Sequence, residues 1–313
     1  MSIRIIPRLD IKGPNLVKGI HLEGLRVLGK PEWFARHYYD QGADELFYMD
    51  AVASLYGRNN LLAIVERTAH DIFIPLTVGG GLRSVDDIRA VLRAGADKVA
   101  LNTAAIERPD LIREASRAFG SSTIVVSIDA IRKPDSSYEA YTEYGRQQSG
   151  LDAFDWALKA VELGAGELMV TSIEREGTGK GFDLSLIRRI ADSVPVPVIA
   201  GGGAGQAEDV FQVIRDGHAD AVSLASLFHY QAIKQVQPAS GDYDQEGNTE
   251  FIRRKGAGFS HIRDCSIPEL KHTLRAHGLD CRPAKATEPS TAPEPLKPGH
   301  RLESCARCGE QTD

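Results

Sequence analysis

The sequence predicts a single (β/α)8 barrel built from two similar half-barrels. Short β-rich runs alternate eight times with amphipathic helical stretches, and strands that alternate with helices pair in parallel through right-handed crossovers. The chain also repeats itself at an interval of about 120 residues. Such a half-repeat suits a closed, even-numbered barrel better than an open doubly wound sheet, and no Gly-x-Gly-x-x-Gly follows the first strand.

The predicted elements follow one another in regular order. Ser84 before Val-Asp-Asp and Pro109 in a first turn mark helix starts. A glycine follows each of four predicted helices, where a left-handed cap favours this residue: Gly42, Gly95, Gly164 and Gly217. Strands are expected near 3–9, 45–50, 75–78, 98–101, 124–129, 167–171, 196–200 and 221–225. Helices are expected near 31–41, 59–70, 84–94, 109–119, 151–163, 185–192, 207–216 and 267–277.

The repeat duplicates three chemically distinct features. Asp10 and Asp129 each end an apolar run, 79–81 and 201–203 are matching Gly-Gly-Gly turns, and Asn102 matches Ala225. Two equivalent sites of this kind predict a roughly two-fold ligand, with a phosphate at each end and chemistry between them.

Composition limits the classes of function. The chain has 313 residues, is 42% hydrophobic and carries a net charge of −6, which gives no support for a nucleic-acid partner. No apolar run is long enough for a membrane span, and Arg4 and Pro7 interrupt the only run that could resemble a signal peptide. All four cysteines lie in the last fifth of the chain, so a cytoplasmic location is expected.

Two segments fall outside the barrel pattern. We expect the barrel to span residues 1–282, with a polar, Gly-rich insertion at about 231–263 whose basic run 253–255 is read as a solvated loop. Residues 283–313 are rich in Pro, Glu, Thr and Ser and read as a disordered tail. Cys305 and Cys308 form a lone CxxC in this tail, without a second ligand pair at normal spacing, so neither a metal nor another cofactor is predicted.

The candidate site lies where a barrel of this class performs its chemistry, at the carboxyl ends of the strands. Asp10 and Asp129 end strands on opposite sides and could act as general acid and general base on one substrate, although a single Asp there would more often cap a turn. The glycine turns could cradle phosphates through backbone N–H groups. Candidate binding residues are Lys18, Gly81, Asn102, Thr103, Thr171, Gly177, Gly202, Gly203, Ala225 and Ser226.

Four charged residues begin strands at the opposite end. Arg4, Glu45, Lys98 and Glu167 are unusual there unless they are paired. They could form a structural plug or a gate through the barrel floor.

Together these residues resemble the cyclase-subunit family of imidazole glycerol phosphate synthase, from histidine biosynthesis. The likeness covers residues 2–230 and the last helix. Its most specific segments include 9–12, 16–19, 77–81, 95–98, 102–105, 164–167 and 202–205, with Ala225-Ser226. The resemblance implies a heterodimer with a glutaminase docked on the floor and ammonia passing the four-charge gate. It also implies a two-phosphate substrate, a formimino-linked aminoimidazole carboxamide ribonucleotide, and Asp10 and Asp129 as the acid–base pair.

The chain departs from the family pattern at three positions. Arg8 stands where a small residue or cysteine is usual, Gly201 replaces a serine, and Glu176 replaces an aspartate. These departures, with the insertion and the tail, leave open a paralogue that supplies ammonia for amidation of a sugar nucleotide in surface-glycan synthesis. Two further alternatives are the phosphoribosyl isomerase of the same pathway, against which the four floor charges argue, and a non-catalytic scaffold that activates a glutaminase, against which Asp10 and Asp129 argue.

Overall fold

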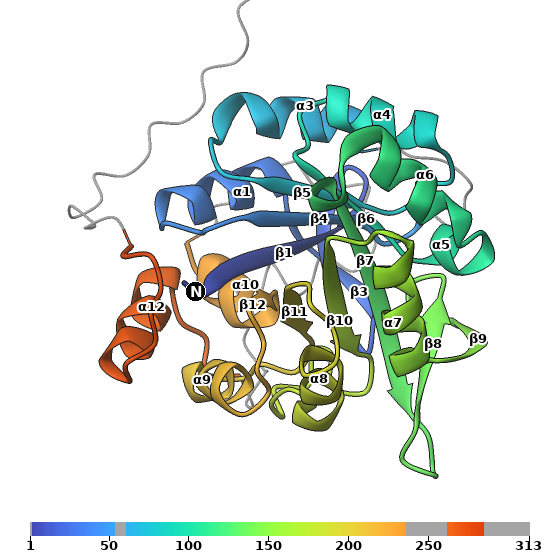
Figure 1. Ribbon diagram of the computed structural model, residues 1–313. Helices are drawn as coiled ribbons and strands as arrows, with labels where there is room; N and C mark the ends of the chain where they lie inside the picture. Colours follow the sequence, from blue (N-terminus) through green and yellow to red (C-terminus); the bar gives the residue numbers. More distant parts are fainter. Residues whose placement is uncertain (1, 54–60, 236–261, 285–313) are drawn as a thin grey trace, which may run out of the picture.

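The centre of the molecule is a closed barrel of parallel strands with helices outside it (Figure 1). The computed structural model describes residues 2–53, 61–235 and 262–284. Within these ranges the barrel strands are β1 (Arg4–Lys12), β4 (Leu46–Asp50), β5 (Leu76–Gly79), β6 (Lys98–Leu101), β7 (Ile124–Arg132), β10 (Glu167–Ser172), β11 (Val198–Gly201) and β12 (Ala221–Leu224). Each strand pairs in parallel with the next in this order, and β12 pairs with β1 to close the ring. The predicted fold class is confirmed.

The long helices cover the outside of the barrel and overlap the predicted ranges. They are α1 (Pro31–Asp40), α3 (Leu62–Asp71), α4 (Val85–Arg93), α6 (Asp110–Phe119), α7 (Ala153–Leu163), α8 (Leu184–Ala191), α9 (Ala207–Arg215) and α12 (Ile267–Ala276). Ser84 caps α4 in a capping box with Asp87, as its position predicted. Gly42, Gly95 and Gly164 have positive φ, but the expectation for Gly217 was wrong, because the left-handed residue there is His218.

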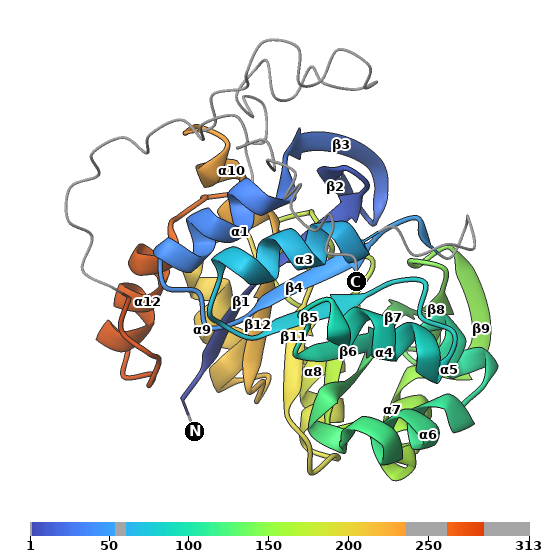
Figure 2. The same cartoon turned by 90° about the horizontal axis from the view of Figure 1, so that it is seen from above.

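Two hairpins extend the strands that carry the aspartates. The antiparallel pair β2 (Asn15–Ile20) and β3 (Glu23–Gly29) continues from β1, and β8 (Tyr138–Thr142) and β9 (Gln147–Asp152) continue from β7. No strand was expected between residues 10 and 30, so the hairpin β2–β3 was not predicted. Figure 2 shows the hairpins apart from each other, with β8–β9 beside the short helix α5 (Thr103–Glu107). A second short helix, α10 (Ser226–Ala232), follows β12 as α5 follows β6, so the internal repeat extends to these additions.

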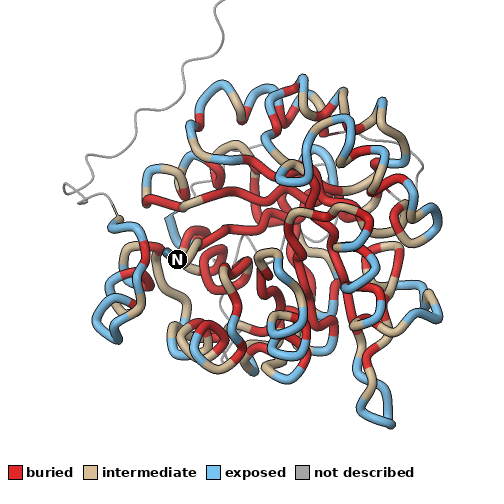
Figure 3. The backbone as a smooth tube through the Cα atoms, viewed as in Figure 1, coloured by how far each residue is buried: buried red, intermediate tan, exposed pale blue. Residues whose placement is uncertain are grey.

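Apolar side chains form two layers, one on each face of the barrel wall. The larger cluster lies between the strands and the helices and includes Ile5, Leu9 and Tyr48. The smaller cluster fills the interior and includes Ile6, Phe47 and Met169. Because neighbouring residues of a strand point to opposite faces, both layers are built from the same strands. The strands are buried along most of their length, whereas the helices expose their outer faces (Figure 3).

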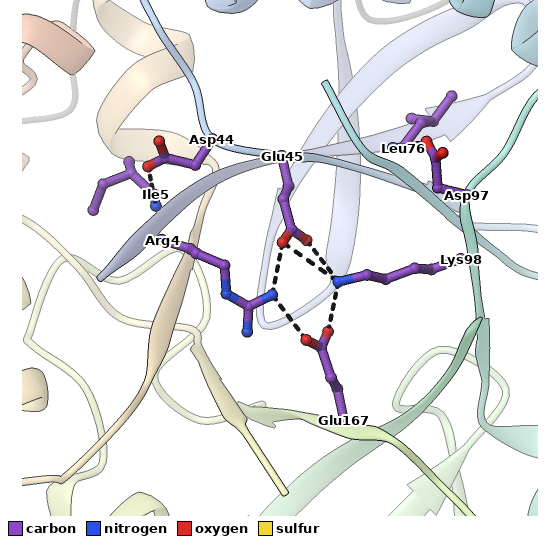
Figure 4. A network of polar contacts seen from close by, with 8 residues as sticks. All are labelled: Arg4, Ile5, Asp44, Glu45, Leu76, Asp97, Lys98 and Glu167. Atoms are coloured by element: carbon purple, nitrogen blue, oxygen red, sulfur yellow. Dashed lines mark hydrogen bonds and ion pairs between the residues drawn. The ribbon is translucent and has the colours of Figure 1, made fainter. Parts of the chain in front are cut away.

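The turns that precede the strands at the floor share one pattern of hydrogen bonds. Asp44 accepts a hydrogen bond from the Ile5 backbone N–H at 2.8 Å, and Asp97 accepts one from the Leu76 N–H at 2.8 Å (Figure 4). Asp220 does the same for the Val198 N–H at 2.9 Å. The recurring Ala-Asp pairs therefore satisfy N–H groups at the starts of neighbouring strands.

Helix α12 is fastened to the same end of the barrel. The buried ammonium of Lys271 donates to the Gly42 carbonyl and to Asp44, each at 2.8 Å. No helix among the described residues is long and apolar enough to cross a membrane. Residues 236–261 of the predicted insertion, almost all of the predicted tail, and the Cys305–Cys308 pair lie outside the described residues.

Candidate active site

A closed ring of four charged side chains forms the barrel floor (Figure 4). Arg4, Lys98 and Glu167 begin β1, β6 and β10, and Glu45 directly precedes β4. Arg4 Nη1 lies 2.7 Å from Glu45 and 2.9 Å from Glu167, and Lys98 Nζ lies 3.2 Å and 3.1 Å from the same two carboxylates. Since each cation contacts both anions, the cost of burying these charges is offset by pairing. The four residues predicted as a gate meet at one place, and their gating role remains a prediction.

The residues above the ring follow the two-residue period of the strands. Alternate side chains of a strand share a face, so those in register with a floor charge also point inward. The inward series are Arg4–Ile6–Arg8 on β1, Glu45–Phe47–Met49 on β4, Lys98–Ala100–Asn102 from β6 and Glu167–Met169–Thr171 on β10. The middle member of each series belongs to the interior apolar cluster. An apolar layer therefore separates the charged floor from the mouth of the barrel.

Asp10 and Asp129 lie near the carboxyl ends of β1 and β7. These strands are four positions apart in the ring of eight, so they stand on opposite sides of the barrel. Both carboxylates are almost fully buried, with exposed fractions of 1% and 3%. Burial raises the pKa of Asp129; the charge of Arg8 acts against this and that of Asp10 adds to it, and the net shift is upward.

A cavity of about 110 Å³ opens at the mouth on the side of the first half-barrel. Asn102 Nδ2 donates to Asp129 Oδ2 at 3.0 Å beside this cavity. The other side-chain oxygens, Asn102 Oδ1 and Asp129 Oδ1, are buried and have no hydrogen-bond partner among the described residues. Such atoms suit a ligand that donates hydrogen bonds. The lining includes Asp50, Gly80, Gly81, Asn102, Thr103, Asp129 and Tyr144, so four of the predicted site residues meet here.

The glycine turn of this cavity requires glycine. Gly80 and Gly81 have φ values of +99° and +72°, a conformation that side chains disfavour. A Cβ on Gly80 would also approach the backbone oxygen of Asp50 to 2.7 Å. The turn therefore holds its backbone close to the end of β4.

The second half-barrel repeats the turn but covers it with a loop. Gly202 and Gly203 have φ values of +83° and +111°. The Gly181 backbone N–H donates to the Gly203 carbonyl at 2.9 Å, and a Cβ on Gly203 would lie 2.2 Å from the Gly181 oxygen. Ala225 and Ser226 follow β12 as Asn102 and Thr103 follow β6. The two halves are thus similar in backbone, while the loop after β10 lies against the second one.

The hairpin β2–β3 is fastened to the same loop. Lys18 forms an ion pair with Glu176, and both side chains are buried, with exposed fractions of 2% and 8%. The His21 backbone N–H donates to the Glu176 carbonyl at 2.9 Å, and Gly177 packs against Gly19. Lys18, predicted to bind substrate, is engaged by Glu176 here, and its contact with a ligand remains a prediction.

Two residues of the site were not predicted from the sequence. Arg8, noted only as a departure from a family pattern, donates from Nε to Asp10 Oδ1 at 2.9 Å and from Nη1 to Thr171 Oγ1 at 3.3 Å. Tyr144, in the turn between β8 and β9, lines the cavity and hydrogen-bonds to Asp10 through its hydroxyl group. Arg8 and Tyr144 therefore contact Asp10, whereas Asp129 lines the cavity.

Comparison with known proteins agrees with this arrangement. A family model described as histidine biosynthesis protein matches residues 4–234. The imidazole glycerol phosphate synthase subunit HisF of Legionella pneumophila is 57% identical over 208 residues, which cover 66% of this chain and 98% of the relative. The chain belongs to the histidine biosynthesis protein family, and within it is a homologue of the synthase subunit HisF.

Proposed function

We propose that this chain is the ammonia-dependent cyclase of imidazole glycerol phosphate synthase, acting in the cytoplasm. Its substrate is the bis-phosphorylated formimino aminoimidazole carboxamide ribonucleotide. The products are imidazole glycerol phosphate and aminoimidazole carboxamide ribonucleotide. The observation that carries the proposal is a charged floor and a two-carboxylate mouth at opposite ends of one barrel, in a chain 57% identical to a HisF relative.

The mouth supplies the groups that this reaction needs. Cleavage and ring closure require proton transfers on opposite sides of the substrate, and carboxylates are suitable donors and acceptors. Asp10 and Asp129 come from opposite strands of the ring. Gly81 with Asn102 and Thr103, and Gly203 with Ser226, would hold the two phosphates through backbone N–H groups, as glycine turns at helix starts do.

Two hydroxyl groups stand among the apolar side chains between the floor and the mouth. Ser127 and Ser223 occupy inward positions of β7 and β12. Their hydroxyl oxygens are buried and have no hydrogen-bond partner among the described residues. A small neutral molecule such as ammonia could exchange hydrogen bonds with these groups after passing the ring. This supports an ammonia route through the barrel.

The floor also offers a surface for a glutaminase. Phe73, just before β5, is 79% exposed, and it borders a groove of about 350 Å³. This groove ends at Asp97, next to Lys98 of the ring. A partner seated here would cover apolar surface and release ammonia beside the gate.

The comparisons do not favour the three alternatives. The relative that covers most of this barrel is named as a synthase subunit, which fits neither the isomerase nor a scaffold.

Turnover of the two-phosphate substrate by the purified chain with ammonium salt tests the proposal. We expect aminoimidazole carboxamide ribonucleotide and imidazole glycerol phosphate in equal amounts, and no turnover without ammonia. Isomerisation without any nitrogen source would instead identify the isomerase. An intact substrate in the presence of ammonia would contradict the cyclase assignment.

A further inference from the structure

The two mouth carboxylates have different surroundings, and Arg8 donates a hydrogen bond to Asp10. We propose that Arg8 is a positioning residue that divides the pair: it holds Asp10 as the proton acceptor and leaves Asp129 to carry and donate the proton. This inference rests on the proposed function, in which both carboxylates act on one substrate.

Asp10 has a charged donor. The Arg8 guanidinium donates to Oδ1 at 2.9 Å, and the hydroxyl group of Tyr144 also bonds to this carboxylate. Charge-assisted bonds of this kind stabilise the ionised form of a carboxylate. Because Arg8 and Asp10 are two residues apart on β1, they share the inward face, and the strand itself sets their pairing.

Asp129 has the opposite surroundings. Its Oδ1 is buried, has no hydrogen-bond partner among the described residues, and belongs to a side chain that lines the mouth cavity. Its donors are neutral: Asn102 bonds to Oδ2, and the hydroxyl group of Thr171 also hydrogen-bonds to this carboxylate. Burial shifts the pKa of Asp129 upward, against the charge of Arg8. This carboxyl group is therefore the member of the pair that holds a proton most readily.

Arg8 is fixed in place by more than its ion pair. Its side chain is 4% exposed, Nη1 donates to Thr171 Oγ1 at 3.3 Å, and the guanidinium carbon lies 5.9 Å from the centre of the Tyr144 ring. Burial alone would lower the pKa of Arg8, but the neighbouring acidic groups, Asp10 foremost, more than offset it. The guanidinium thus remains a permanent positive charge at the mouth.

The other ionisable groups around Arg8 do not replace this charge. Lys18 and Glu176 pair with each other, so the pair adds little net charge. The acidic groups that face Arg8 from the other elements are Asp129 on β7, Tyr144 from the β8–β9 turn and Glu176 from the loop after β10; Asp50 at the end of β4 lines the cavity. Arg8 bonds directly to Asp10, and its charge also acts on Asp129. Removal of Arg8 should therefore weaken the stabilisation of the ionised form of both carboxyl groups.

The proton count of the proposed division balances over one turnover. Ammonia forms a bond to the formimino carbon while the bond from that carbon to the nitrogen of the departing ribonucleotide breaks, and two protons pass from the ammonia nitrogen to the departing nitrogen. Asp10 accepts each of these protons, and Asp129 donates each one. Water returns each proton from Asp10 to Asp129. Ring closure then joins the new nitrogen to the carbonyl carbon, whose oxygen leaves as water. No oxidant, reductant or further reactant is needed.

The pH profile of kcat/KM for Arg8→Met, compared with that of the unchanged protein and of Arg8→Lys, tests this role. Loss of the cation should move both limbs of the profile to higher pH, by roughly 1–3 units for a neighbouring opposite charge. Arg8→Lys keeps the charge and should stay within about half a unit. A lower rate with unmoved limbs would mean that Arg8 only supports the structure and would overturn the proposal.

A titration that needs no turnover keeps the proposal separate from the assigned function. Carboxyl carbons of ¹³C-labelled aspartates would be followed by NMR, with Asp10→Asn and Asp129→Asn identifying the two signals. We expect the Asp129 signal to titrate above the ordinary range of an aspartate carboxyl group, and at still higher pH in Arg8→Met, because the charge of Arg8 acts against the upward shift. An Asp129 signal in the ordinary range, or one that does not move in Arg8→Met, contradicts the division of roles. Failure of turnover with the expected titration would instead contradict the proposed reaction alone.

Discussion

Asp129 lines the mouth cavity, and its Oδ1 has no hydrogen-bond partner within residues 2–53, 61–235 and 262–284, whereas Asp10 is held by Arg8 and Tyr144. We expect Asp129→Asn and Asp10→Asn each to lower kcat by roughly 10²–10⁴-fold, because an amide keeps the shape but transfers no proton. KM should change little. The matched control is Asp135→Asn, on the exposed β7–β8 turn, which should retain full activity. Losses below ten-fold at both mouth positions would contradict their catalytic role.

Gly203 allows a second test at the scale of one residue. Gly203→Ala places a Cβ against the Gly181 oxygen, in addition to a backbone cost of roughly 1–3 kcal/mol for its positive φ. Gly120→Ala is the control, since Gly120 has φ of +90° but a Cβ added there would meet no atom within 4 Å. Thermal unfolding should show a larger loss for Gly203→Ala. Inorganic phosphate should stabilise the control more than Gly203→Ala. Equal phosphate effects would argue against a phosphate cradle at this turn.

Among the elements, the hairpin β2–β3 is tied to the loop after β10 by the buried Lys18–Glu176 pair. Lys18→Met leaves a buried carboxylate without its partner, which costs roughly 3–5 kcal/mol. The double variant with Glu176→Gln should recover much of this loss in urea unfolding. Lys159→Met, in an exposed pair with Glu162, should change the free energy of unfolding by at most about 0.5 kcal/mol. Additive losses in the double variant would show that the pair does not join the two elements.

The hairpins, like the short helices α5 and α10, were not predicted from the sequence, and the turns of the hairpins explain why they were missed. His21 and Leu22 join β2 to β3 with φ values of +54° and +62°, and Glu143 and Tyr144 adopt +52° and +58° after β8. Two-residue turns of this kind are usually recognised in a sequence by Asn-Gly or Asp-Gly. Here residues other than glycine adopt that backbone conformation, and the side chain of one of them, Tyr144, lines the mouth cavity. Backbone strain of this kind concentrates at functional sites.

At the scale of the whole molecule, the repeated pattern was enough to predict the barrel, because each strand and helix has its own periodicity and end signals. The meeting of Gly81, Asn102 and Asp129 also followed, since the carboxyl ends of parallel strands share one face. The Arg8–Asp10 pair was within reach of the two-residue period but was not recognised. The Lys18–Glu176 pair could not be predicted from this period, since its partners are 158 residues apart and only the closed barrel brings them together.

The floor ring carries the prediction that involves the whole assembly. Lys98 contacts both Glu45 and Glu167, so its removal breaks two of the four links of the ring at the far end of the barrel from Asp129. We expect Lys98→Ala to leave turnover with free ammonium salt nearly unchanged, because ammonia from solvent reaches the mouth directly. Glutamine-dependent turnover in the complex with the glutaminase should fall, because ammonia released beneath the floor has to pass the damaged gate. Phe73→Ala should also lower glutamine-dependent turnover, but by weakening the complex. A saturating concentration of the glutaminase should therefore restore the turnover of Phe73→Ala. Lys159→Ala, on the outer face, is the control for both variants. Equal loss of Lys98→Ala activity with both nitrogen sources would mean that the ring only closes the barrel and that ammonia reaches the mouth by another path.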